Sequence, residues 1–144
     1  MAYVSAAVYD AAVAIEGGFD PYGTAIEAPP GASLNAAVVE AAYQTLRNYF
    51  PSQAATLDPL HAEALALIPD GQSKDDGQAA GMAAADGIIT LRTGDGRLTP
   101  IGVTSPFETK PPAPGVWRLT PPFALPQTPW VGSVRPFILK KIHM

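Results

Sequence analysis

The stretch SKDDGQAAGMAAADGIITLR, residues 73–92, decides the fold expected for this chain. Its Gly77, Gly81 and Ala85 recur every four residues, a spacing that places side chains on one face of an α-helix. An interior glycine costs a helix about 1 kcal/mol relative to alanine. A stripe of such small residues is therefore best explained by a helix that lies very close to a neighbouring helix.

The ends of this helix are also predicted from particular residues. Ser73 and Asp76 have the Ser-x-x-Asp spacing of a weaker relative of the capping box. Gly94 is expected to follow the last turn in a left-handed conformation. The segment Gly94-Asp95-Gly96 is not expected to cradle phosphate, because it lacks a following Gly-Lys-Ser/Thr and no helix is predicted after it.

The first helix is expected over residues 2–16, where apolar residues recur at helical spacing. Asp10 and Glu16 would then face solvent, and Gly17-Gly18 would end the helix. It starts almost at Met1 without a capping residue before it, as if it began inside a larger structure. The residues of its predicted apolar stripe are Val4, Val8, Ala11, Ala12 and Ile15.

A second helix is expected over residues 33–49, with Ser33 as its N-cap and Pro51 beyond its end. Its predicted apolar face consists of Leu34, Val38, Ala41, Ala42, Leu46 and Tyr49. A third helical stretch runs to about Leu67 but contains Asp58-Pro59. Proline inside a helix costs about 3 kcal/mol, so we expect a kink there, or a restart with Asp58 as cap and Pro59 as the first helical residue.

Composition limits the function classes. At 144 residues the chain is expected to form one domain. A net charge of −4, with no basic residue before Arg47, argues against a nucleic-acid partner. The absence of cysteine removes disulfides and thiolate sites. No apolar run reaches the roughly 18 residues of a membrane span, and no basic segment marks a signal peptide, so a soluble chain of unknown location is expected.

The last third has a different character, because ten of the sixteen prolines lie between Pro100 and Pro136. The segment PPAPGVWRLTPP, residues 111–122, cannot form a helix or a central strand. Its surroundings are nevertheless too apolar for a solvated tail. We interpret residues 97–144 as an extended strap that docks on a surface, stiffened by proline. The candidate interface residues are Trp117, Phe123, Trp130 and Phe137.

Few residues suggest chemistry. His61 and His143 are 82 positions apart, and we expect the first to be structural or at the surface and the second to belong to the tail. Asp70, Asp75 and Asp76 are better explained as acids near a helix N-terminus than as a cation site. A solvated surface is expected for the scattered basic residues Arg92, Arg97, Lys110 and Arg118.

Three segments, taken in order, carry a resemblance to a known family. They are AAVYDAAVAIEGGFDPY (6–22), the stretch from PSQAATLD to LRTGDG (51–96), and GVWRLTPPFALPQTPWVGSVRPF (115–137). Together they resemble the N-terminal helical half of bacterial vanadium-dependent haloperoxidase-like proteins, in the phosphatidic acid phosphatase type 2 superfamily. The resemblance covers nearly the whole chain and implies an all-helical fold built from two bundles.

The resemblance also implies an oxyanion site for vanadate or phosphate, formed in relatives by Lys, Arg, a Pro-Ser-Gly-His segment and a final Arg and His. This chain contains no Ser-Gly-His, and no Lys stands seven positions before an Arg-Pro. Lys110 is eight positions before Arg118, and Thr128 stands seven before Arg135. The resemblance places the site beyond the last residue of this chain, so no catalytic, cofactor or metal residue is assigned.

These observations predict an all-α protein, with about four helices in a bundle over residues 1–96 and the strap over 97–144, in a single domain. We expect it to be inactive alone and to associate with a second copy or with a separate catalytic half that would bring vanadate or phosphate. One alternative is a small-molecule binding protein with an apolar pocket lined by Tyr9, Tyr43 and Met82. Others are an enzyme that uses Asp10 or Glu40 as a base, and the product of a truncated reading frame.

Overall fold

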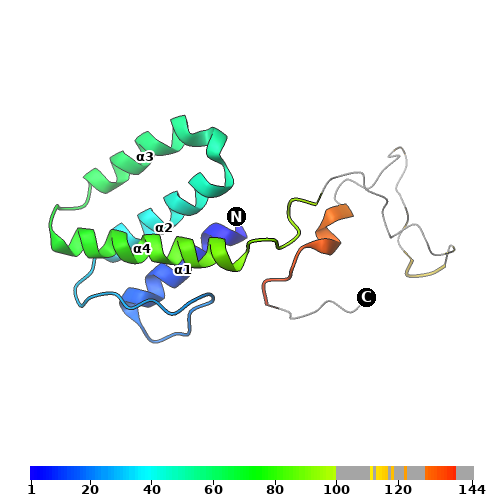
Figure 1. Cartoon of the computed structure of the whole chain (residues 1–144), viewed down its shortest axis with the longest axis horizontal. Helices are drawn as coiled ribbons and strands as arrows, with labels where there is room; N and C mark the ends of the chain where they lie inside the picture. Colours follow the sequence, from blue (N-terminus) through cyan, green and yellow to red (C-terminus); the bar gives the residue numbers. More distant parts are fainter. Residues whose placement is uncertain (100–110, 112, 117, 119–121, 123–128, 139–144) are drawn as a thin grey trace. The chain divides into compact units, whose positions relative to one another are not determined.

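The computed structural model describes residues 1–99, 111, 113–116, 118, 122 and 129–138 (Figure 1). It divides the chain into two compact units, Met1–Thr93 and Gly94–Met144. The described residues contain four α-helices and the short 3₁₀ turns η1 (Pro51–Gln53) and η3 (Pro129–Ser133), with no β-strand among them. The expected helical class is thus confirmed, whereas one domain divided at residue 96 stays a prediction.

All four α-helices lie in the first unit: α1 (Ala2–Glu16), α2 (Leu34–Tyr49), α3 (Ala54–Ala66) and α4 (Gln72–Leu91). Helices α1, α2 and α4 pack against one another (Figure 1). Helix α3, in contrast, packs on α2 but on neither α1 nor α4. The sequence therefore predicted all four helices to within a few residues, but not this unequal packing.

The helix ends agree with the predictions at two places. Helix α1 stops at Gly17, whose φ of 70° is favourable for glycine and strained for other residues. The Ser33 hydroxyl accepts a hydrogen bond of 3.2 Å from the Ala36 amide, as an N-cap should. Gly94 also has the predicted left-handed conformation, with φ 66°, although α4 already ends at Leu91.

The predicted capping box at the start of α4 is wrong. The helix begins one residue before Ser73, so this side chain lies inside the first turn. The Ser73 hydroxyl donates a hydrogen bond to the Gly31 carbonyl at 2.7 Å. The backbone carbonyl of Ser73 accepts a hydrogen bond from the Ser33 amide at 2.8 Å. Asp76 accepts from Gln72 at 2.8 Å. Ser73 thus ties α4 to the segment before α2 instead of capping its own helix.

The predicted restart at Pro59 is also wrong, because α3 runs from Ala54 to Ala66 with Pro59 inside it. The 3₁₀ turn η1 leads into α3 at Ala54, five residues before Pro59. Because proline has no amide proton, the helical hydrogen bond from residue 59 to the Ala55 carbonyl is missing. Asp58 does not cap the helix, because its carboxylate pairs with Arg47 on α2 at 2.8 Å. The contacts of α3 with α2, which include this ion pair, keep α3 helical through Pro59.

The core of the first unit is made almost entirely of alanine. It consists of Ala7, Ala11, Ala37, Ala41, Ala80, Ala84 and Ile88. The larger residues of the predicted stripes, such as Val8, Ile15 and Leu46, are only half-buried around it. Such small side chains can fill the space between helices only where the helix axes lie close together.

The predicted close approach of α4 to α2 is confirmed at two glycines. A Cβ atom at Gly77 would overlap the Ser33 carbonyl oxygen, and one at Gly81 would overlap the Ala37 carbonyl oxygen. The second would also lie 2.8 Å from the Cβ of Glu40. The backbones of the two helices are therefore in direct contact, and this contact brings Glu40 into the interior.

The second unit contains a small hydrogen-bonded framework around Asp95, which is 4% exposed. The Arg135 amide donates to the Asp95 carbonyl at 2.7 Å, and the Arg97 amide donates to the Asp95 carboxylate at 3.1 Å. A Cβ atom at Gly96 would overlap the Ser133 carbonyl oxygen. These contacts join residues 95–97 to residues 133–135.

Candidate functional site

Two carboxylates are buried inside the first unit, Asp10 on α1 and Glu40 on α2, each 2% exposed. The prediction that Asp10 faces solvent is therefore wrong. Buried carboxylates need hydrogen-bond donors, since an uncompensated buried charge costs several kcal/mol. The donors differ between the two residues, and this difference separates a structural carboxylate from a candidate site.

Asp10 holds the loop that follows α1. Its two carboxylate oxygens accept from the backbone amides of Tyr22, at 2.6 Å, and Gly23, at 2.9 Å. The neighbouring Tyr9 hydroxyl donates to the Asp20 carbonyl at 2.9 Å. Gly23 has no room for a side chain, because a Cβ there would lie 2.9 Å from Asp10. Both oxygens of Asp10 are thus engaged by backbone, which makes this residue a clamp rather than a catalytic base.

Glu40 is surrounded by donors from three helices. The Gln44 amide donates to Oε1 at 2.6 Å, one turn along α2. Oε2 lies 2.8 Å from His61 Nε2 on α3 and 3.4 Å from the Gln78 amide nitrogen on α4. Both carboxylate oxygens therefore have side-chain partners. One of these partners, His61, has a side chain that is 17% exposed and links the buried acid to the surface.

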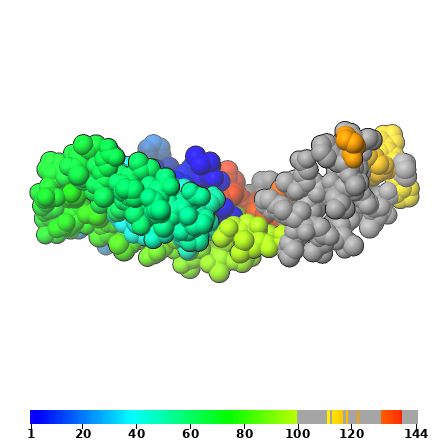
Figure 2. Space-filling model, turned by 90° about the horizontal axis from the view of Figure 1, so that it is seen from above, coloured from blue at the N-terminus to red at the C-terminus, as the bar shows by residue number. Residues whose placement is uncertain are grey.

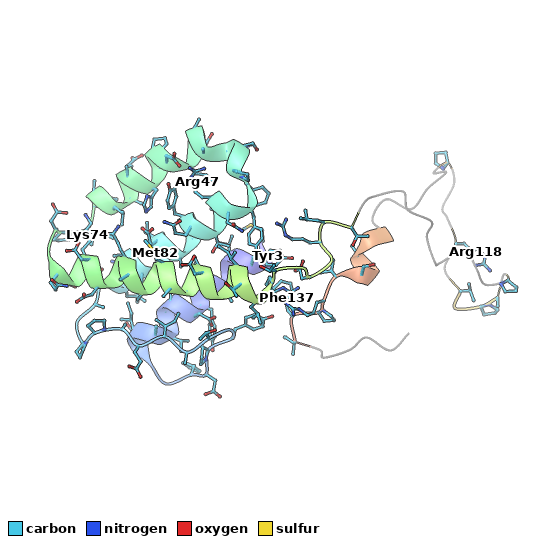
Figure 3. The ribbon with its side chains drawn as sticks, viewed as in Figure 1. Tyr3, Arg47, Lys74, Met82, Arg118 and Phe137 are labelled. Atoms are coloured by element: carbon cyan, nitrogen blue, oxygen red, sulfur yellow. The ribbon has the colours of Figure 1, made fainter. Side chains whose placement is uncertain are left out.

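A second layer of side chains fixes the imidazole of His61. The Tyr43 ring stacks on it, with centroids 3.7 Å apart and planes within 3°. The Tyr43 hydroxyl donates to Asp58 at 3.1 Å, and Asp58 also pairs with Arg47 at 2.8 Å. The hydrogen bond with the Tyr43 side chain and the charge of Asp58 raise the pKa of Arg47. Figure 3 shows Arg47 between α2 and α3.

We call this set the Glu40–His61 network; its members are Glu40, Tyr43, Gln44, Arg47, Asp58, His61 and Gln78. From sequence, Glu40 is a candidate base and His61 a structural or surface residue, and nothing connects the two. A signal for the burial of Glu40 was present, because it follows Ala36 and Ala37 at helical spacing. Nothing in the sequence indicates its partner 21 residues later.

The candidate interface residues lie mostly outside the described part of the chain. Trp117 and Phe123 are not among the described residues, and for Trp130 only its place in η3 is given. Phe137 is described and half-buried. The strap and its aromatic interface therefore stay predictions.

The three residues proposed to line an apolar pocket have other surroundings. Tyr9 is 42% and Met82 46% exposed, so both lie at the surface. Tyr43 belongs to the Glu40–His61 network. Figure 3 shows Met82 on α4.

The remaining polar candidates are engaged locally. Asp70 accepts from Lys74 at 2.8 Å, and this hydrogen bond and the lysine charge lower the pKa of Asp70. No three His, Asp or Glu side chains within the described residues cluster as a metal site requires. The expectation that Arg92 is solvated is wrong: it is 3% exposed, with its guanidinium 5.6 Å from the centre of the Tyr3 ring.

No family model, curated protein or solved structure matches this chain. In the described part of the chain, no helix is both long and apolar enough to cross a membrane. Its function therefore has to be argued from the geometry given above.

Proposed function

We propose that this chain is a helical association module that does not turn over halide or phosphate ester alone and acts by binding a partner. The supporting observation is its distribution of apolar side chains. Alanine fills the core, whereas Phe19, Leu60 and Leu67 are 75%, 56% and 84% exposed. Contiguous exposed apolar surface is typical of surfaces that become covered in a complex, and Leu60 and Leu67 lie about two helical turns apart at α3.

Helix α3 is the element on which this argument rests most. None of its residues is buried, and among the helices it packs on α2 alone. In the space-filling view its outer surface is not covered by another described helix (Figure 2). A helix held on one side only is stabilised further when a partner covers its other side.

The finer proposal comes from the resemblance to haloperoxidase-like proteins. In it, the helices of residues 1–96 form a bundle of about four and residues 97–144 form the strap, with Trp117, Phe123, Trp130 and Phe137 as the interface. The partner is a second copy of the chain or a separate catalytic half. Vanadate or phosphate would then be bound only in the complex with that half.

Charge bears on the choice of partner. Residues 1–93 contain eleven acidic and three basic residues, a net charge of −8, whereas residues 94–144 contain two acidic and six basic residues, a net charge of +4. Two like-charged first units repel one another. A second copy is thus expected to be contacted through its residues 94–144, and a catalytic half through a basic surface.

The test is the molar mass of the purified full chain by light scattering after gel filtration, over a wide range of concentrations and at low and high salt. A mass that rises with concentration supports a homo-oligomer, and a Trp130→Ala variant should lower it. A monomer at every concentration that also fails to bind a haloperoxidase-type catalytic half contradicts the proposal. Bromination of a phenol by the pure chain with vanadate, peroxide and bromide would contradict its inactivity.

The alternative, a small-molecule binding protein with an apolar pocket between helices, stays a prediction. An apolar ligand that binds the folded state raises the melting temperature, and the stabilisation grows with the logarithm of the ratio of its free concentration to its Kd. A screen of small aromatic and aliphatic compounds by thermal shift tests it.

A further inference from the structure

Within the described residues, one nitrogen of His61 in the Glu40–His61 network, Nδ1, has no protein hydrogen-bond partner. Glu40 engages Nε2 of His61, and no described residue forms a hydrogen bond with Nδ1. No polar side-chain atom in the described part of the chain is both buried and without a partner. Nδ1 must therefore reach solvent, consistent with the 17% exposure of the side chain.

The protonation pattern of the ring follows from its partner. A carboxylate accepts hydrogen bonds and cannot donate them, so the proton of the neutral imidazole lies on Nε2, facing Glu40. Nδ1 then carries the free lone pair. A buried carboxylate that selects the tautomer and orientation of a histidine is the arrangement that makes imidazole an effective base or nucleophile.

The network also prevents the ring from turning away. Tyr43 covers one face of the imidazole, and Tyr43 is itself held through Asp58. A surface-facing imidazole nitrogen can hydrogen-bond to water, so the feature that matters here is the fixed orientation of the ring. Here one nitrogen is fixed by a buried acid and the other is presented to solvent.

We propose that His61 is a reactive histidine whose Nδ1 attacks neutral acyl electrophiles, namely carboxylic esters, with Glu40 as its positioning residue. The lone pair of Nδ1 forms a bond to the carbonyl carbon, and the bond from that carbon to the alcohol oxygen breaks, so the alkoxide leaves and takes a proton from solvent, which the water that later cleaves the acyl–nitrogen bond gives back. The positive charge of the acyl-imidazolium lies against Glu40. Water then cleaves the acyl–nitrogen bond, so one ester and one water give one acid and one alcohol, and the imidazole is regenerated.

Charge restricts the substrate class to neutral molecules. The unit that carries His61 has a net charge of −8, and Asp58 and Glu63 lie on the same helix. Anionic electrophiles such as acyl phosphates or phosphoramidates are repelled by this field. A neutral ester approaches without that cost. The inference is independent of the association proposal, because all residues involved lie within Met1–Thr93.

The chain offers its own control, because it contains two histidines. In the His143→Asn variant, His61 is the one remaining histidine. The ¹⁵N NMR shifts of the His61 ring then report its tautomer directly. We expect the proton on Nε2 and a bare Nδ1. A proton on Nδ1 overturns the proposal. This measurement needs no change to the network itself.

The second measurement is hydrolysis of p-nitrophenyl acetate by the full chain near neutral pH. We expect His143→Asn to keep most of the rate and His61→Asn to lose most of it, with Glu40→Gln lowering the rate while the helical circular dichroism is retained. Should His61→Asn or Glu40→Gln fail to fold, mass spectrometry of the native chain after brief acetylation locates the modified residue. Acetylation of His143 in preference to His61, or a full rate in a folded His61→Asn, overturns the proposal.

Discussion

Two of the helices that pack on α2, namely α4 and α3, contact it in opposite ways. Against α4 it presents backbone and methyl groups, and the glycines at 77 and 81 leave no space between the helices. Against α3 it presents long polar side chains, which meet Asp58 and His61 through hydrogen bonds and stacking. The first interface is held mainly by close backbone contact, with the 3.4 Å hydrogen bond from Gln78 to Glu40 beside it, while the second is held by directional polar contacts.

The difference teaches how Glu40 acquires its environment. A long acidic side chain is normally exposed on a helix. Here the close approach at Gly81 encloses the Cβ of Glu40, and the polar interface with α3 supplies His61 as a partner of its carboxylate. The tight interface thus creates the buried position, and the polar interface makes that position tolerable. Neither interface alone would hold a carboxylate at 2% exposure.

The largest effect is expected from breaking the tight interface with Gly81→Ala. The added methyl group would overlap the Ala37 carbonyl oxygen, which belongs to the backbone and cannot rotate away. Helices α2 and α4 must separate, so the free energy of unfolding should fall by about 2–3 kcal/mol despite the better helix propensity of alanine. Urea unfolding followed by circular dichroism measures the change.

Gly87→Ala is the matched control in the same helix. A Cβ there would have Thr24 as its nearest neighbour at 3.9 Å, an ordinary van der Waals distance. The same substitution should therefore stabilise the protein by about 0.5–1 kcal/mol through helix propensity alone. Equal effects of the two variants would contradict the close approach of α2 and α4.

A smaller effect is expected from the polar interface with His61→Phe. Phenylalanine keeps a ring to stack on Tyr43 but removes the hydrogen bond to Glu40, whose Oε2 then retains only the 3.4 Å contact with Gln78. An under-satisfied buried acceptor costs about 1–3 kcal/mol. We expect a loss of about 2 kcal/mol in the urea-unfolding free energy.

Tyr43→Phe provides the comparison for this variant. It keeps the stack on His61 and removes the hydrogen bonds of the hydroxyl group with Asp58 and Arg47, whose side chains are 49% and 33% exposed. Its cost should be below about 1 kcal/mol. A loss as large as that of His61→Phe would show that the interface depends on stacking and surface polar contacts rather than on the buried carboxylate.

The tight interface was predictable from sequence and the polar one was not. Gly77, Gly81 and Ala85 recur at a fixed interval within one helix, so local spacing indicates close packing. The polar interface depends on residues 21 positions apart, Glu40 and His61, whose meeting depends on the direction that the chain takes after η1. Local pattern carries no information about that direction.

Burial was predicted poorly for a related reason. Where alanine occupies several faces of a helix, hydrophobic contrast is weak, and helix separation decides which face is inside. Of the predicted stripes, Ala11 and Ala41 are in the core as expected, whereas Val8 and Leu46 are only half-buried and the core residues Ala7 and Ala37 were not among them. Asp10 was assigned to solvent because its partners are backbone amides 12 and 13 residues away, which no side-chain pattern reveals.

The smallest effect is expected at the surface, from Asp70→Asn at the start of α4. Lys74 lowers the pKa of Asp70 below its ordinary value of 3.8, so the folded state favours the charged form more than the unfolded state does. The stability gained from this pair is present above that value and is lost as pH falls through the lower pKa of the folded state. The urea midpoints of native chain and variant should differ slightly near pH 6 and converge at strongly acidic pH. Because the Asp70 carboxylate is fully exposed, we expect only a small loss of stability from Asp70→Asn. A loss in unfolding free energy close to that of His61→Phe would mean that α4 is stabilised chiefly by contacts at its N-terminal end and not by the glycine contact with α2.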